Sequence, residues 1–266
     1  MIRDITLGQY YPAKSVIHRL DPRIKLTGTL AYIIGLFILD NFWGLLMAGV
    51  FLASVIKLSH VPLSYIVRGL KPILIIIIFT FILNMLMLDG EPLFTFWKFT
   101  VTKEGLYKAL FMAARLVLLI LGSSILTFAT KPISLTDGME AQMKPFERFG
   151  LPAHELAMMM TIALRFIPTL LEETDKIMKA QQARGADFES GNIFKRAKNM
   201  IPILVPLFIG AFRIAQEIAM AMEARCYRGG AGRTRMNVMK YEKCDFAAAV
   251  LILIFVGGCI GCRILL

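Results

Sequence analysis

Charged side chains are scarce in this sequence of 266 residues. Asp, Glu, Lys and Arg together make up 18% of the chain, whereas 57% of its residues are hydrophobic and its mean hydropathy is +0.64. In a soluble domain, about a quarter of the residues are usually charged. The composition therefore argues against an ordinary soluble domain and indicates an integral membrane protein.

Cysteine and histidine are also rare, with four and three residues respectively. Cys226, Cys244, Cys259 and Cys262 are too few and too scattered for a disulfide framework. Cys259 and Cys262 lie in an apolar run, where packing in a membrane helix is a commoner role than redox chemistry. The P-loop, H-E-x-x-H and EF-hand patterns are all absent. We therefore expect no catalytic site, metal or cofactor in this chain.

Basic residues exceed acidic ones by 30 to 19, which gives a net charge of +11. In a soluble protein this excess would favour a nucleic-acid partner, but in a membrane protein the positive-inside rule explains it. Residues 1–25, 57–71 and 131–243 hold 25 of the 30 basic residues. We therefore predict that these segments face the cytoplasm, with the N-terminus inside and the C-terminus outside, and we expect no nucleic-acid partner.

Five apolar runs are expected to cross the membrane, at residues 26–39, 42–56, 72–88, 106–129 and 246–260. The first two are shorter than the roughly 20 residues that a span usually needs, although Lys25 and Lys57 can snorkel to extend them. Asp21-Pro22 is a typical helix start. Residues 89–105 are mixed and aromatic, as expected at a membrane interface.

The sequence therefore predicts an all-α polytopic membrane protein with about five transmembrane helices. We expect a cytoplasmic segment at 1–25, four spans within 26–130, a cytoplasmic domain of long amphipathic helices at 131–243 and a final span within 244–266. Within the cytoplasmic domain, residues 200–224 are apolar enough to dip into the membrane, but Arg213 and Glu217 argue against a full crossing.

Arg115 and Arg165 lie in largely apolar helical stretches. An intramembrane charge is by default a functional hypothesis. The alternative, and the commoner case, is that each arginine pairs with a nearby acid or a backbone carbonyl. Pro168 removes a backbone donor, so we predict a bend near Leu164 that sets how the two long helices cross.

Residues 152–230 read as two long amphipathic helices, because apolar residues recur at the three-and-four spacing of one helical face. Each helix ends in an arginine between small residues. A helix C-terminal cation beside a capping glycine explains one such end. Its repetition favours a second hypothesis, in which each planar guanidinium enters a groove of a partner. The two ends are Ala183-Arg184-Gly185 and Ala224-Arg225-Cys226.

These two motifs resemble the paired Ala-Arg-Gly motifs of the transmembrane T component of energy-coupling factor (ECF) transporters. Residues 8–12, 15–25 and 227–230, which include His18-Arg19-Leu20-Asp21-Pro22-Arg23, resemble that family as well. Cys226 stands where glycine is common, so a very close backbone approach is not expected at the second end.

The resemblance implies a non-catalytic scaffold in a prokaryotic cell membrane. Such a component joins two cytoplasmic ATPases to a small membrane subunit that binds a vitamin or metal ion. The ATPases bind ATP and receive Arg184 and Arg225, and the long coupling helices transmit their motion for micronutrient uptake.

Two other classes compete with this interpretation. A membrane-embedded enzyme would need a cluster of His, Asp or Glu at the membrane face, and the sequence offers none. The other class is a channel or permease. A channel or secondary transporter would show polar residues distributed along its spans, for which Asn84 and Arg115 are too few. A conventional ABC permease subunit is closer, but the sequence lacks the polar translocation lining that it would need.

Overall fold

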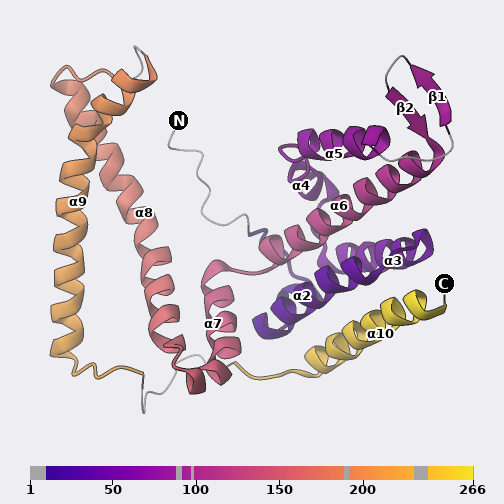
Figure 1. The fold of residues 1–266 in the computed structure, drawn as a ribbon. Coiled ribbons are helices and arrows are strands. Elements are labelled where there is room, and N and C mark those ends of the chain that lie inside the picture. The colour runs from indigo at the N-terminus through magenta and orange to yellow at the C-terminus, as the bar shows by residue number, and fades with distance from the viewer. Residues whose placement is uncertain (1–9, 88–91, 97–98, 189–191, 231–238, 266) are drawn as a thin grey trace. The chain divides into compact units, whose positions relative to one another are not determined.

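The computed structural model describes residues 10–87, 92–96, 99–188, 192–230 and 239–265. Helices dominate it (Figure 1). They are α1 Val16–Arg19, α2 Pro22–Ile38, α3 Phe42–Ser59, α4 Leu63–Arg68, α5 Leu74–Met87, α6 Lys103–Ala129, α7 Pro132–Met143, the 3₁₀ helix η1 Lys144–Phe149, α8 Ala153–Ala183, α9 Ile193–Ala224 and α10 Lys243–Leu265. The predicted helical architecture is confirmed, with one addition: an antiparallel hairpin of β1 Pro92–Phe96 and β2 Phe99–Thr102.

Among the described residues, five helices are long and apolar enough to cross a membrane, as the sequence predicts. Three of them, α3, α6 and α10, match predicted spans. The other two are α8 and, from Lys198 onward, α9, whose hydropathies of 1.2 and 1.6 are the lowest of the five. The predicted spans at 26–39 and 72–88 form the shorter helices α2, of 17 residues, and α5, of 14. The cytoplasmic position of 131–243 stays a prediction.

The described residues divide into two compact units. The bundle unit comprises the described parts of Gly8–Gln142 and Val238–Leu266, including β1 and β2. The hairpin unit comprises those of Met143–Asn237 and is named for its pair of long helices, α8 and α9. Almost all of α7 therefore lies in the bundle unit, although the predicted helical domain begins at residue 131. Gln142 is the last residue of α7 that belongs to the bundle unit. Its Nε2 donates to the Arg23 carbonyl at 3.1 Å and to Thr27 Oγ1 at 2.8 Å.

Helix α2 begins where the sequence predicts. The Asp21 side chain accepts a hydrogen bond from the Arg23 amide at 2.9 Å, and Pro22 occupies the first turn, where its missing N–H has no helical acceptor to lose. At α6, the Thr102 side chain caps in the same way and accepts from the Gly105 amide at 3.1 Å. Local side-chain chemistry therefore determines both helix starts.

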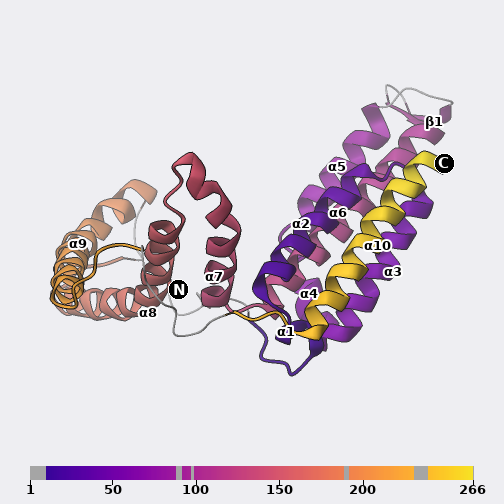
Figure 2. The same ribbon diagram turned by 90° about the horizontal axis from the view of Figure 1, so that it is seen from below.

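The core of the bundle unit lies among α2, α3, α6 and α10. Helix α10 lies beside α2 in both views, although the two are at opposite ends of the sequence (Figures 1 and 2). The rings of Tyr32, Phe51 and Phe255 stack with centroids 4.5–6.2 Å apart. A methyl group at Gly122 would come within 2.3 Å of the Tyr32 ring, so α6 packs closely on α2 only because this residue has no side chain.

Candidate functional site

Arg184 is the C-terminal cap residue of α8. The Gly185 amide donates to the Gln182 carbonyl at 2.9 Å, and the Ala186 amide donates to the Gln181 carbonyl at 3.0 Å. Gly185 has φ +87°, in the left-handed region. These two hydrogen bonds, together with the left-handed residue between them, form a Schellman cap, which satisfies the last carbonyls of the helix.

Arg225 has the same place at the end of α9. The Cys226 amide donates to the Glu223 carbonyl at 2.8 Å, and the Tyr227 amide donates to the Met222 carbonyl at 3.1 Å. Cys226 has φ +55°, so a cysteine takes the left-handed position that Gly185 takes in the first cap. The two arginines therefore leave their helices in matching backbone geometry.

Side-chain surroundings at the two caps are open. The six predicted contact residues are exposed, and neither guanidinium has an ion pair or hydrogen bond to any of the described residues. A methyl group placed on Gly185 would have nothing within 4 Å. The six are Ala183, Arg184, Gly185, Ala224, Arg225 and Cys226. Each cap is thus complete through its backbone alone, which leaves both guanidinium groups available to another molecule.

Two side-chain hydrogen bonds join the end of α8 to the beginning of α9. Asn199 Nδ2 donates to the Asp187 carbonyl at 2.6 Å, and Gln181 Nε2 donates to the Pro202 carbonyl at 3.5 Å. The second bond has a local cause. Pro206 has no N–H, so the carbonyl of Pro202, four residues earlier, lacks its helical donor. Gln181 therefore occupies an acceptor that the proline leaves free.

At the other end of the pair, the chain that follows α9 returns to the beginning of α8. A methyl group at Gly230 would lie 2.6 Å from the His154 ring, so the backbone passes directly over that side chain. Helices α8 and α9 therefore run antiparallel (Figure 1), and Arg184 and Arg225 lie at opposite ends of the hairpin. For helices of 31 and 32 residues, this separation is about 45 Å at 1.5 Å per residue.

Pro168 lies inside α8, which continues as one helix from Ala153 to Ala183. Its missing N–H leaves the Leu164 carbonyl without the usual helical donor. Arg165 and Pro168 are both exposed, and the Arg165 side chain has no ion pair or hydrogen bond to the described residues. Within this part of the chain, the expected internal pairing is therefore not formed at Arg165. The bend at Pro168, and its effect on the crossing of the helices, stays a prediction.

Arg115, the other candidate charge, is 9% exposed and has internal partners. Its Nη2 donates to the Leu39 carbonyl and lies 3.6 Å from Asp40 Oδ1. Its guanidinium carbon lies 4.7 Å from the centroid of the Phe111 ring, within range of a cation–π contact. The prediction that Arg115 pairs with an acid or a carbonyl is confirmed. This side chain joins α6 to the turn between α2 and α3.

A polar cluster at the beginning of α2 was not predicted to have a structural role. Asp245, from α10, is 1% exposed and accepts hydrogen bonds from the amides of Asp21 at 2.8 Å and Glu242 at 2.7 Å. Lys25 Nζ donates to the carbonyls of His18 and Ala129 at 3.0 and 3.1 Å. The His18–Lys25 run is therefore where α1, α2, α6 and α10 join. The one sequence signal for this junction is Asp245, an acid at the start of an apolar run.

His18 is held in one tautomer within this cluster. Its Nε2 donates to the Tyr11 carbonyl at 2.9 Å, because a carbonyl oxygen can only accept. Its Nδ1 then accepts from the Ser15 hydroxyl at 2.7 Å. Burial lowers the pKa of His18 below its ordinary value of 6.5, and nearby Lys25 lowers it further, while the hydrogen bond to the Tyr11 carbonyl opposes the shift.

Comparison with known proteins identifies the family of this chain. A family model described as CbiQ, cobalt transport protein, matches residues 13–237. Proteins named "Energy-coupling factor transporter transmembrane protein EcfT" match nearly the full chain. The chain is 57% identical over 249 residues to the one from Thermosediminibacter oceani, with 94% of each chain covered. It is 58% identical over 259 residues to that of Clostridium kluyveri and 46% identical over 255 residues to that of Bacillus subtilis, with 96% of each chain covered.

These matches confirm the resemblance found in the sequence motifs. Proteins so named are non-catalytic transmembrane components of transporters, and the apolar helices of this chain agree with a multi-pass membrane protein. The chain therefore belongs to the CbiQ family, as a transmembrane component of an ECF transporter complex.

Proposed function

We propose that this chain joins two cytoplasmic ATPase subunits to a substrate-binding membrane subunit and transmits ATP-driven motion for vitamin uptake. Arg184 anchors one ATPase and Arg225 the other. ATP binds to the partner subunits, and the substrate is held by the membrane subunit. The hairpin unit faces the cytoplasm, in line with its share of the basic residues.

The observation that carries this proposal is the equivalence of the two caps. Two exposed arginines leave two Schellman caps in the same backbone geometry, at opposite ends of one helical hairpin, without a partner among the described residues. A guanidinium offers a planar fork of donors that matches carboxylates and carbonyls in a partner's groove. Two equivalent anchors far apart fit two copies of one kind of partner, or two close relatives.

Transmission of motion needs stiff elements that are tied together. Helices α8 and α9 each extend for more than 30 residues and end in caps that satisfy their last carbonyls. The hydrogen bonds of Gln181 and Asn199 connect them at one end of the hairpin. A displacement of either cap by its ATPase would therefore move the hairpin as a unit and reach the substrate-binding subunit.

The experiment is subunit pull-down together with vitamin uptake, for wild type, Arg184→Ala, Arg225→Ala and the double variant. Loss of a charged contact of this kind costs about 2–5 kcal/mol at an interface, so each single variant should bind its ATPase at least about 30-fold more weakly. The double variant should lose both ATPases and keep the substrate-binding subunit. Lysine at either position should restore binding only in part, because it keeps the charge without the fork.

Arg213→Ala is the matched control, because Arg213 is also exposed on α9 but lies within the helix instead of at its cap. It should leave assembly and uptake unchanged. Full ATPase retention and normal uptake in the double alanine variant would show that the two arginines act only as helix caps.

A further inference from the structure

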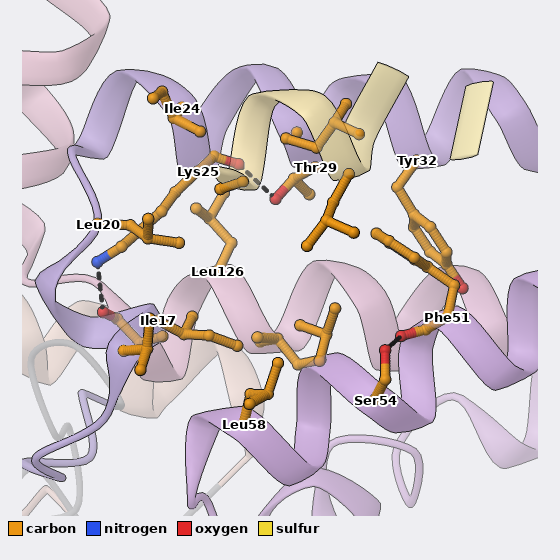
Figure 3. A pocket seen from close by; sticks show the side chains of 18 of the residues that line it. Ile17, Leu20, Ile24, Lys25, Thr29, Tyr32, Phe51, Ser54, Leu58 and Leu126 are labelled. Atoms are coloured by element: carbon orange, nitrogen blue, oxygen red, sulfur yellow. Dashed lines mark hydrogen bonds between the residues drawn. The ribbon is translucent and has the colours of Figure 1, made fainter. Parts of the chain in front are cut away.

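The bundle unit contains a cavity of about 330 Å³ that the transporter role described above does not use. Its walls come from α1, α2, α3, α6 and α10 (Figure 3). Its size lies near the lower end of the range for small-molecule pockets, about 300–1,000 Å³. Leucine, isoleucine, valine, alanine and phenylalanine make up most of the lining.

The polar side chains of the lining direct their polar atoms to backbone carbonyls. Thr29 Oγ1 donates to the Lys25 carbonyl at 2.8 Å, and Ser54 Oγ donates to the Phe51 carbonyl at 2.6 Å (Figure 3). The Tyr32 hydroxyl donates to the Leu118 carbonyl at 3.3 Å. A polar ligand would therefore lose its own hydrogen bonds to water and gain few here, whereas a hydrocarbon would lose none.

Among the described residues of the lining, Lys25 is the one cation, and it is also bound internally, to two carbonyls. In Figure 3 its amine lies near Leu20, at the opposite end from Tyr32 and Phe51. Lys25 and Tyr32 are seven residues apart on α2, which corresponds to a cavity length of about 10 Å. The shape is therefore that of a short apolar slot that runs along α2.

The slot has an opening toward the lipid. Val16 of α1, Leu58 of α3 and Leu251 of α10 all line it, yet they are 52%, 50% and 54% exposed. Helices α3 and α10 are long and apolar enough to span a membrane, and in a membrane this opening would face lipid hydrocarbon. Leu58 is the second-last residue of α3, so the opening lies at one end of this candidate span.

Charge at the opening is positive. Arg19 lies three residues after Val16 on α1, and Lys57 lies three residues after Ser54, which also lines the slot, on α3. A spacing of three places two side chains on one side of a helix. Arg19 and Lys57 are exposed, and neither side chain has an ion pair or hydrogen bond to another described residue. They can therefore attract an anionic headgroup.

We propose that this slot binds one acyl chain of an anionic phospholipid, whose phosphate lies beside Arg19 and Lys57. The chain end extends along α2 toward Tyr32 and Phe51. The lipid would fill a space between α3 and α10 that the protein's own side chains leave open.

The test is native mass spectrometry of the full-length chain, purified in detergent and then supplied with phosphatidylglycerol or phosphatidylcholine. Ala248→Phe on α10 and Ser54→Phe on α3 each place a ring in the slot from a different wall. Each should lower the retention of phosphatidylglycerol about tenfold, since losing even two buried methylenes has an effect of this size. Two variants on separate helices keep the test valid if one of them fails to fold.

Val250→Phe and Ala53→Phe are the matched controls, because these exposed residues of α10 and α3 lie outside the lining. Both should retain phosphatidylglycerol as the wild type does. Replacing Arg19 and Lys57 together by Gln should remove the preference for phosphatidylglycerol over phosphatidylcholine. Undiminished retention in the folded Ala248→Phe and Ser54→Phe variants would overturn the acyl-chain site, and equal wild-type retention of the two lipids would overturn the headgroup contact.

Discussion

The charged side chains at the helix junctions of the bundle unit and the two cap arginines of the hairpin unit differ in their partners. In the bundle unit, Arg115, Lys25 and Asp245 all have hydrogen-bond partners inside the fold. In the hairpin unit, Arg184 and Arg225 have none among the described residues. A buried charge without its partner is strongly destabilising, whereas an exposed charge is solvated by water. The difference therefore separates charges that stabilise the fold from charges that are available to other subunits.

Asp245 should give the largest effect on stability. Replacing it by Ala leaves the amides of Asp21 and Glu242 without their acceptor at a site that is almost fully buried. We expect the free energy of unfolding to fall by about 3 kcal/mol and the midpoint of thermal unfolding in detergent by roughly 6–10 °C. The exposed Glu217→Ala is the control. A shift no larger than that of the control would contradict the structural role of this cluster.

Arg115→Met should give the next largest effect. It removes the donor to the Leu39 carbonyl and the contact with Asp40, while it keeps an unbranched apolar stem. We expect the free energy of unfolding to fall by about 2 kcal/mol. Arg184→Ala and Arg165→Met, both at exposed positions, should stay within about 0.5 kcal/mol of wild type. Thermal unfolding of the three variants side by side compares the two uses of arginine directly.

Residues 185 and 226 allow the two caps to be compared with each other. A cysteine at φ +55° is strained, because only glycine adopts the left-handed region freely. Cys226→Gly should therefore stabilise the hairpin unit by about 0.5–1 kcal/mol, and Gly185→Cys should destabilise it by a similar amount. Hydrogen exchange of the Cys226 and Tyr227 amides would measure the first change, and that of the Gly185 and Ala186 amides the second. Unchanged protection in both variants would show that cap geometry does not depend on these residues.

His18 should give the smallest effect. Its pKa is lowered on folding, mainly by burial, so the unfolded chain binds a proton more readily than the folded chain does. Stability should therefore fall as the pH drops through 6.5 toward the lower pKa of the folded chain, and should level off above 6.5. Thermal unfolding between pH 5 and 8 would measure this slope. His18→Gln should flatten it, while an identical slope would assign the dependence to other groups.

Local features of the fold could be predicted from the sequence because each depends on residues a few positions apart. Asp21-Pro22 begins α2, and Gly185 provides the cap of α8. The three-and-four spacing of apolar residues predicted the long helices α8 and α9. At Cys226, glycine is missing, so the sequence alone did not indicate that the second cap has the same left-handed geometry as the first.

Long-range contacts could not be predicted in this way. The Asp21 amide and the Asp245 carboxylate are 224 residues apart in the chain, and no local pattern connects them. The Gln181 side chain meets the Pro202 carbonyl only because α8 and α9 pack together. The apolar slot likewise depends on how five helices pack against one another.

The sequence by itself determined the helical membrane class, the long helices and the arginine at the end of each, because composition, helical periodicity and capping act over short distances. Only the tertiary structure decided that these arginines lie at opposite ends of an antiparallel hairpin, and that Arg115 has internal partners while Arg184 and Arg225 have none among the described residues. The physical reason is that a charged side chain's partner is chosen by packing between distant segments, which spacing along the chain does not encode.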